Sequence, residues 1–303
     1  MDKEILNQLC NIAGIEHVLV DEPMYKHTTF KVGGKADYYI IPHTIEEIKS
    51  TILFLKKQNI PFCVVGNGSN LLVSDNGYHG AIIKIYNNFN EIEINKLSIK
   101  AQAGALLSDI ATKACEAGLK NFEFAAGIPG TIGGAAVMNA GAYGGEMQQV
   151  LTTVTVMDEE GNIKTLTNEE LQFGYRTSVI STNHYTVLEA EIGLECGDCT
   201  EIKAIIDDYG QRRADKQPLE YPSAGSTFKR PKGYFAGKLI MDAGLRGYAI
   251  GGAQVSEKHC GFIINKNNAT AKDVIQLIRY VQNQVWEQFG VKLETEVKML
   301  GEF

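Results

Sequence analysis

Gly127-Ile-Pro-Gly-Thr-Ile-Gly-Gly-Ala-Ala-Val-Met-Asn-Ala-Gly-Ala-Tyr-Gly-Gly145 lies near the middle of the chain. Seven of its nineteen residues are glycine, and none has a charged side chain. Because glycine loses much conformational entropy on folding, this density indicates a backbone that turns tightly or lies close against a ligand. Main-chain N–H groups among small side chains suit a phosphate ester. The stretch therefore predicts a phosphate-binding loop.

A second run of the same character is Val65-Gly-Asn-Gly-Ser-Asn-Leu-Leu-Val73. It is not the GxGxxG fingerprint of dinucleotide-binding βαβ units, because Leu71 stands where the third glycine is required. Taken alone, the run is equally consistent with a tight turn. Two such loops in one chain indicate a large phosphorylated cofactor held between them. Backbone amides could donate hydrogen bonds to its pyrophosphate. So could the side chains of Ser69, Asn70, Thr131 and Asn139.

Composition excludes several classes of function. The net charge of the 303 residues is −7 and no basic block is present, so nucleic acid is not an expected partner. The first residues, MDKEILNQLC, lack an apolar signal core, and no apolar run approaches the roughly 20 residues of a membrane span. The six cysteines are scattered, as expected of a protein in a reducing cytoplasm.

Cys196-Gly-Asp-Cys199 has the CxxC spacing of redox and metal sites. No second pair with zinc-like spacing accompanies it, and a redox role would need a helix to begin at the first cysteine. We interpret the two cysteines as incidental residues before a helix. His27, His79 and His259 show no metal-ligand spacing either, so no metal site is expected.

Strands and helices alternate along the first two thirds of the chain. Thr44-Ile-Glu-Glu47 predicts a capped helix N-terminus, and Asn59-Ile-Pro61 ends that helix. The other expected helix here is 106–117. Strands are expected at 62–65, 81–85, 97–101, 153–157, 162–166 and 185–194, and 153–157 and 162–166 would form a hairpin.

From Thr200 the pattern changes, and we place a domain boundary near residues 195–200. An amphipathic helix is expected around Ile202, Ile205, Ile206 and Tyr209, ending at Arg212-Arg213. The clearest helix runs from Thr270 to Phe289, is capped by Thr270 and Asp273, and ends at Gly290. Its apolar stripe is formed by Val274, Ile278, Val281, Val285 and Phe289.

Three short segments contain candidate reactive groups, each with a structural alternative. Arg176 in Phe173-Gly-Tyr-Arg-Thr177 could bind a carboxylate or phosphate, or form a surface ion pair. Ser226 in Pro222-Ser-Ala-Gly-Ser-Thr-Phe-Lys-Arg-Pro231 lacks a nucleophile elbow, so it would donate a proton or cap a helix. Leu293-Glu-Thr-Glu-Val297 reads as an edge strand with both glutamates on one face, which could instead be a solvated acidic face.

These segments occur together, and in this order, in one family. The chain resembles the UDP-N-acetylenolpyruvoylglucosamine reductases, flavoenzymes of peptidoglycan precursor synthesis. The matching segments are Thr29-Phe-Lys-Val-Gly-Gly34, Val65–Asn70, Gly127–Gly134, Asn139–Tyr143, Gly174-Tyr-Arg176, Ala224–Lys229, Gly251-Gly-Ala253 and Leu293–Val297. Thr295 departs from the family, which usually has proline there. The roughly 50 residues between Arg176 and Ser226 resemble the shorter subtype, which lacks a tyrosine-bearing loop over the substrate.

The resemblance implies an α+β fold in three regions. Residues 1–86 and 87–197 would be the two FAD-binding subdomains of a vanillyl-alcohol-oxidase-like fold. Residues 198–303 would be a separate α+β substrate-binding domain with a C-terminal catalytic strand. Non-covalent FAD, NADPH as co-substrate and UDP-N-acetylglucosamine enolpyruvate as substrate are implied with it, while the oligomeric state stays open.

The resemblance also implies which residues form the site. Arg176, Ser226 and Glu296 match the family's catalytic trio. The residues expected to bind FAD are Val65, Gly66, Asn67, Gly68, Ser69, Asn70, Gly127, Pro129, Gly130, Thr131, Gly133, Gly134, Asn139 and Gly141. The residues expected to bind substrate are Tyr175, Lys229, Lys232 and Arg246.

Two rival functions remain open from the sequence. A flavin oxidase with covalent FAD commonly tethers the flavin to a histidine in the first phosphate-binding loop, and residues 66–72 contain none. A non-catalytic flavin carrier would not need an arginine, a serine and a glutamate around the flavin.

Overall fold

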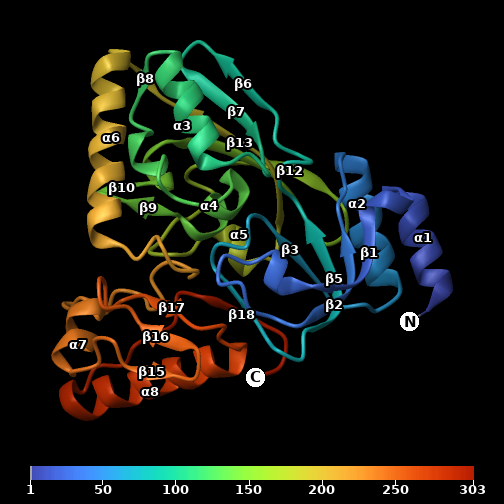
Figure 1. Cartoon of the computed structure of the whole chain (residues 1–303). Helices are drawn as coiled ribbons and strands as arrows, with labels where there is room; N and C mark the ends of the chain where they lie inside the picture. Colours follow the sequence, from blue (N-terminus) through green and yellow to red (C-terminus); the bar gives the residue numbers. More distant parts are fainter. Residues whose placement is uncertain (1) are drawn as a thin grey trace. The chain divides into compact units, whose positions relative to one another are not determined.

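The computed structural model describes residues 2–303 (Figure 1). Its helices are α1 Lys3–Ala13, α2 Ile45–Lys57, α3 Leu107–Glu116, α4 Ile132–Met138, α5 Val179–Thr182, α6 Cys199–Lys216, α7 Ala236–Asp242 and α8 Ala271–Phe289. Its strands are β1 Val18–Pro23, β2 Lys35–Ile40, β3 Phe62–Val65, β4 Leu71–Val73, β5 Tyr78–Lys84, β6 Ile92–Asn95, β7 Ser98–Gln102, β8 Leu119–Lys120, β9 Gly141–Ala142, β10 Gly145–Glu146, β11 Leu151–Met157, β12 Ile163–Thr167, β13 Thr186–Gly193, β14 Glu195–Cys196, β15 Ala249–Ile250, β16 Ala253–Val255, β17 Ile263–Asn265 and β18 Lys298–Leu300.

The chain divides into two compact units, each with its own apolar core. The first unit comprises residues up to 20, 38–67 and 80–212, and the second comprises 21–37, 68–79 and 213–303. The first glycine-rich loop is thus shared between them. The division into three regions at residues 86 and 197 stays a prediction.

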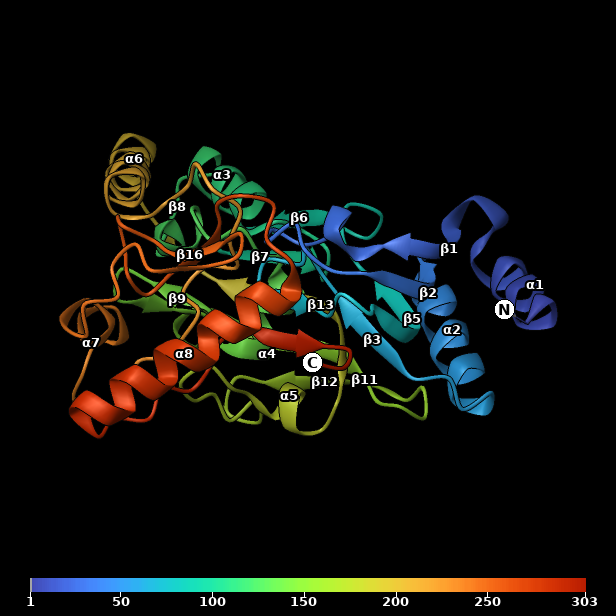
Figure 2. The ribbon, with the colours of Figure 1, turned by 60° about the horizontal axis from the view of Figure 1, so that its bottom comes forward.

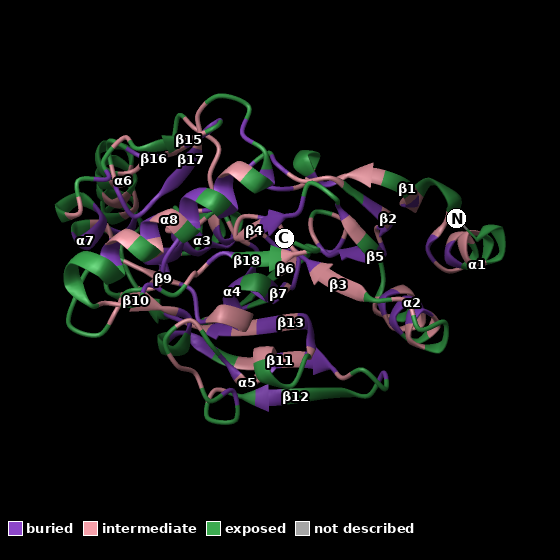
Figure 3. Cartoon of the chain, turned by 90° about the horizontal axis from the view of Figure 1, so that it is seen from below, coloured by how far each residue is buried: buried purple, intermediate pink, exposed green. Residues whose placement is uncertain are grey.

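An antiparallel five-stranded sheet of order β12-β11-β13-β7-β6 forms the centre of the first unit. Its register pairs Val154 with Ala190 and Ala190 with Ala101. Helices α3 and α4 pack against it, and its middle strands are largely buried (Figure 3). Strands β11 and β12 form the hairpin that the sequence predicts. This sheet is the support on which the second glycine-rich stretch lies.

Parallel strands β3 and β5 lead to the first glycine-rich loop. They pair in register from Phe62 with Ala81 to Val65 with Lys84, within a sheet of order β1-β2-β5-β3. The carboxyl ends of two parallel strands lie at the same edge of a sheet. Lys84 therefore ends β5 directly beside the point where β3 gives way to Gly66.

The second unit is built around α8 (Figure 2), which packs against the antiparallel sheet β15-β16-β17 (Figure 1). Thr270 and Asp273 form a reciprocal capping box, and Gly290 ends the helix in a left-handed conformation, as the sequence predicts. The predicted apolar stripe is buried at Val274, Ile278, Val281 and Val285, but the side chain of Phe289 is 39% exposed.

Two elements differ from the sequence prediction. Helix α6 continues beyond Arg213 to Lys216, and of its expected apolar stripe only Ile202 is buried. Residues 293–297 form an isolated bridge, between Thr295 and Phe228, with regular strand β18 starting at Lys298. Within residues 2–303, no helix combines the length and the apolar character that a membrane crossing requires.

Candidate active site

The two glycine-rich loops contact each other in the first unit. A Cβ atom built on Gly66 would lie 2.5 Å from the hydroxyl oxygen of Thr131, so only glycine fits there without displacement. Asn67 donates a hydrogen bond from its side-chain amide to the Pro129 carbonyl, at 2.7 Å. The two loops therefore lie together, as expected, at the residues of the first loop up to Asn67, which belong to the first unit.

The second loop is fixed to the five-stranded sheet beneath it. Thr131 caps α4 by accepting a hydrogen bond from the Gly134 amide at 3.3 Å, and Gly133 donates from its amide to the Ala103 carbonyl at 3.0 Å. A Cβ on Gly133 would lie 2.9 Å from Ala103, whereas one on Gly134 would meet nothing closer than 3.6 Å. Gly133 is therefore required by packing, while Gly134 presents exposed backbone.

Lys84 is a candidate site residue that the sequence patterns did not identify. Its side chain is buried, and its ammonium group donates to the Gly66 carbonyl at 2.7 Å and lies 4.7 Å from the centre of the Tyr86 ring. Burial lowers its pKa from 10.5 to about 8. The signal was present, since lysine rarely occupies a buried strand, and Ala81-Ile-Ile-Lys-Ile85 is apolar apart from it.

Arg176 is held by the residues that follow α4. Its guanidinium donates to the backbone carbonyls of Asn139 and Gly141 at 3.3 and 3.4 Å. The buried amide of Asn139 donates in turn to the Gly174 carbonyl at 3.2 Å. Residues 139–141 and 174–176 therefore form one hydrogen-bonded assembly. Tyr175 is 52% exposed beside Arg176, whose guanidinium carbon lies 5.1 Å from the centre of the tyrosine ring.

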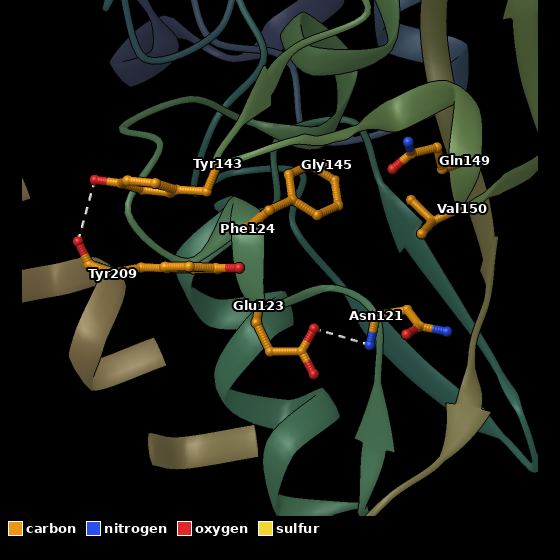
Figure 4. Close-up of a pocket in the computed structure, with 8 residues that line it drawn as sticks. All are labelled: Asn121, Glu123, Phe124, Tyr143, Gly145, Gln149, Val150 and Tyr209. Atoms are coloured by element: carbon orange, nitrogen blue, oxygen red, sulfur yellow. Dashed lines mark hydrogen bonds between the residues drawn. The ribbon is translucent and has the colours of Figure 1, made fainter. Parts of the chain in front are cut away.

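A small pocket of about 270 Å³ adjoins α6 in the first unit (Figure 4). The rings of Tyr143 and Tyr209 are stacked with their centres 4.4 Å apart, and the Tyr143 hydroxyl donates to the Tyr209 carbonyl at 3.1 Å. None of the residues predicted to bind FAD or substrate lines this pocket. Its lining residues are Asn121, Glu123, Phe124, Tyr143, Gly145, Gln149, Val150 and Tyr209.

The second unit brings Ser226 and Glu296 onto adjacent segments. The Glu296 amide donates to the carbonyl of Thr227, the residue after Ser226, at 2.8 Å. The Asn70 side chain donates to the Glu296 carbonyl at 3.2 Å, and β4 and β18 pair in parallel just beyond these two residues. Glu296 is half-buried and Glu294 is exposed. No helix begins at Ser226, since the next one is α7 at Ala236, so the helix-cap interpretation is wrong.

The predicted substrate-binding cations of this unit occupy more open positions. The ammonium of Lys229 pairs with the carboxylate of Glu294 at 3.2 Å. Lys232 and Arg246 are exposed. A guanidinium nitrogen of Arg246 lies 3.2 Å from the Met241 sulfur. No group of three or more His, Cys, Asp or Glu residues among positions 2–303 could hold a metal ion.

Comparison with known proteins shows relatives that match nearly the whole chain. Residues 36–167 match an FAD binding domain, and residues 217–300 match the C-terminal domain of UDP-N-acetylenolpyruvoylglucosamine reductase. A reductase of that name from Clostridioides difficile (strain 630) is 52% identical over 301 residues, covering 99% of each chain. The crystal structure of the Thermus caldophilus reductase is 35% identical, with a TM-score of 0.79, over 94% of this chain and 98% of that one. A Phl p 4 variant described as a glucose oxidase shares only the fold, at 14% identity and a TM-score of 0.51, over 72% of this chain and 51% of that one.

The fold and the paired glycine-rich loops therefore define an FAD-binding oxidoreductase. The α+β fold expected from the sequence is confirmed, with an FAD-binding part that shares its fold with the glucose oxidase variant and a separate C-terminal domain. The Clostridioides difficile reductase matches nearly the whole chain with more than half of the residues identical, which narrows the class further. The chain belongs to the UDP-N-acetylenolpyruvoylglucosamine reductase family.

Proposed function

We propose that the chain reduces the enolpyruvyl ether of UDP-N-acetylglucosamine enolpyruvate to UDP-N-acetylmuramate, using FAD and NADPH. The observation that carries this proposal is the 52% identity, over 99% of both chains, to a reductase named for that substrate. The product is a peptidoglycan precursor. The substrates are small molecules, and NADPH and UDP-sugars are cytoplasmic metabolites, so the protein would act in the cytoplasm.

The two glycine-rich loops fit the pyrophosphate of FAD. Gly134 is exposed and leaves room for a ligand against the backbone, since a Cβ there would meet nothing closer than 3.6 Å, and Lys84 supplies a buried positive charge behind the Gly66 turn. Bound FAD would carry hydride from NADPH to the substrate. The cofactor contacts proposed for the loops are those of Val65–Asn70, Gly127, Pro129–Thr131, Gly133, Gly134, Asn139 and Gly141. In this set Gly133 and the Asn139 side chain serve mainly to hold the loop, because both are engaged with the protein itself.

Arg176 would stabilise negative charge on the substrate carboxylate. When hydride adds to the methylene carbon of an enol ether conjugated to a carboxylate, charge accumulates on the neighbouring carbon and on the carboxylate oxygens. A guanidinium presents two parallel N–H groups to such an anion. The contacts of Arg176 with Asn139 and Gly141 support this role, because they fix the orientation of its planar group before the substrate arrives.

Ser226 and Glu296 would complete the addition. Ser226 would deliver the proton to the carbon next to the carboxylate, and a protonated Glu296 would donate a hydrogen bond to the enolic oxygens. The backbone contact between Glu296 and Thr227 supports a joint role, because it holds the two side chains on neighbouring segments. Lys229 is close enough in sequence to assist Ser226, although Glu294 competes for its ammonium group.

Tyr175, Lys229, Lys232 and Arg246 would bind the UDP-sugar. The three cations match the diphosphate in charge, and exposure leaves Lys232 and Arg246 accessible to it. The division into FAD-binding regions 1–86 and 87–197 and a substrate-binding region 198–303 belongs to the same proposal.

One assay tests this function against its rivals. Oxidation of NADPH by the purified protein should depend on the enolpyruvyl sugar, and a non-catalytic flavin carrier would show no such dependence. Acid precipitation should leave FAD in the supernatant, because residues 66–72 contain no histidine to tether it. FAD that remained in the protein pellet would instead favour a covalent flavin oxidase.

A further inference from the structure

Two cysteines that lie far apart in sequence meet in the first unit. Cys115 is in the last turn of α3, and Cys199 is the first residue of α6. Their sulfur atoms are 3.4 Å apart, and the Cys115 thiol also lies 3.6 Å from the Cys199 carbonyl. Cys115 is buried, whereas Cys199 is exposed. The CxxC spacing drew attention to Cys196, but the sulfur contact pairs Cys199 with Cys115.

Backbone hydrogen bonds hold the two thiols in place. Strands β8 and β14 pair Leu119 with Cys196, and the Gly197 amide donates to the Gly118 carbonyl at 2.8 Å. The segment after Cys115 is thereby fastened to the segment before Cys199. A disulfide needs its sulfurs at about 2.05 Å. The two sulfurs, 3.4 Å apart, would have to approach each other to that distance, and the paired backbone keeps their segments side by side as they do so.

We propose that Cys115 and Cys199 form a reversible thiol pair that a low-molecular-weight disulfide oxidises to an intramolecular disulfide. The thiolate of exposed Cys199 attacks the small disulfide, forming a mixed disulfide and releasing one small thiolate. Cys115 then loses its proton to solvent and attacks the Cys199 sulfur, which releases the second small thiolate. Two protein thiols are oxidised, and one small disulfide is reduced to two thiols.

The surroundings of Cys115 make the second step sensitive to pH. Burial raises the pKa of its thiol. The hydrogen bond with the Cys199 thiol raises this pKa further in the reduced pair, and it is lost once Cys199 is in the mixed disulfide. Lys203 on α6 lowers this pKa and Glu116 on α3 raises it, each less strongly. Because only the thiolate attacks, ring closure accelerates as the pH rises towards the pKa of Cys115. The mixed disulfide on Cys199 should therefore close faster at higher pH.

Closure would join two helices across a segment of 84 residues. A cross-link across a segment of that length removes much conformational freedom from the unfolded chain. The oxidised protein should therefore melt at a higher temperature than the reduced protein. Neither cysteine belongs to the residues proposed to bind FAD or substrate, so the site is separate from the proposed chemistry.

The test treats the FAD-loaded protein with oxidised glutathione at pH 7 and pH 9, blocks free thiols with a maleimide and maps linked peptides by mass spectrometry. We expect a linkage between Cys115 and Cys199 that forms at least tenfold faster at pH 9. Cys115→Ser should stop at a glutathione adduct on Cys199. The matched control Cys196→Ser should form the linkage as the wild type does.

Other outcomes overturn the proposal. A linkage between Cys196 and Cys199 would assign the redox pair to the CxxC motif instead. Cys115 and Cys199 that both remain open to the maleimide, at either pH, would show that their contact has no redox role. An oxidised wild type that melts no higher than the oxidised Cys115→Ser variant would also contradict it. Because NADPH oxidation is not measured, failure here leaves the proposed function untouched.

Discussion

Replacing Lys84 with methionine tests the charge placed behind the first glycine-rich loop. The side chain is only 8% exposed and donates to the Gly66 carbonyl, and burial lowers its pKa to about 8. Methionine has a similar length and fills the same space without a charge. The substitution therefore removes the ammonium group while leaving the packing largely intact.

The size of the effect follows from proton linkage. The lysine pKa is 10.5 in the unfolded reference and about 8 in the folded chain, so between these values the unfolded chain binds more protons. The free energy of unfolding of the apoprotein should then rise with pH from about 8 to about 10.5, by about 3 kcal/mol in total. Below pH 8 both states are charged and the full cost of burial is present. Lys84→Met should lack this rise.

The affinity for FAD should change with pH in the opposite direction, falling where the stability of the apoprotein rises. A pyrophosphate near the loops gives the ammonium group a counter-charge, so it favours the protonated lysine. FAD binding should therefore take up a proton above pH 8, and its affinity should fall by up to roughly tenfold for each further pH unit. Lys84→Met should bind FAD more weakly at pH 7 and lack this dependence.

Urea unfolding of the apoprotein and FAD fluorescence titrations, each from pH 7 to pH 10, measure both effects. Lys57→Met, at an exposed lysine of α2, is the matched control and should behave as the wild type does. The reasoning is refuted if wild type and Lys84→Met share the same pH dependence of unfolding. If unfolding differs as expected but FAD affinity does not, Lys84 carries no charge interaction with the cofactor.

Four further substitutions test the site. Gly133→Ala should lower the free energy of unfolding by about 1–3 kcal/mol, because its Cβ would crowd Ala103. Gly134→Ala should instead keep the melting temperature and raise the Kd of FAD. The reverse pattern in melting curves and FAD titrations would exclude this geometry. Arg176→Lys should reduce kcat by on the order of 10²-fold or more, since one ammonium cannot replace the two-pronged contact, and a near-normal kcat would make Arg176 peripheral. Ser226→Ala should leave flavin reduction by NADPH unchanged in stopped-flow traces but slow reoxidation by the enolpyruvyl sugar roughly 10²- to 10⁴-fold; equal slowing of both steps would indicate a disturbed flavin site.

Local signals in the sequence predicted the regular elements well. The caps at Thr44 and Thr270 depend on residues only three positions away, and the structure shows both. The burial of helix α6 was harder to predict. Its expected apolar stripe needs a partner surface, and the sequence does not show how much of the stripe that surface buries. The extended segment around Glu296 formed a single bridge, because its pairing depends on Phe228, far away in sequence.

The same limit, that contacts between residues far apart in sequence leave no local pattern, is clearer in the site. Glycine-rich loops can be recognised from composition alone, so Gly66 and Thr131 were expected to lie in neighbouring loops. The 84-residue separation between Cys115 and Cys199 leaves no local pattern, and their contact exists only in the folded chain. The contact of Lys84 depends in the same way on Gly66, which directly follows the neighbouring strand β3.

Arg176 shows why a motif can identify a residue without explaining its position. Its backbone adopts a left-handed conformation with φ 57°, and Asn139 does the same with φ 45°. Such a conformation costs a residue with a large side chain about 1–2 kcal/mol. The two residues offset this cost together, because the Asn139 amide binds the Gly174 carbonyl while the Arg176 guanidinium binds the Asn139 carbonyl. The stretch whose glycines suggested a cofactor site therefore also orients the arginine proposed to act on the substrate.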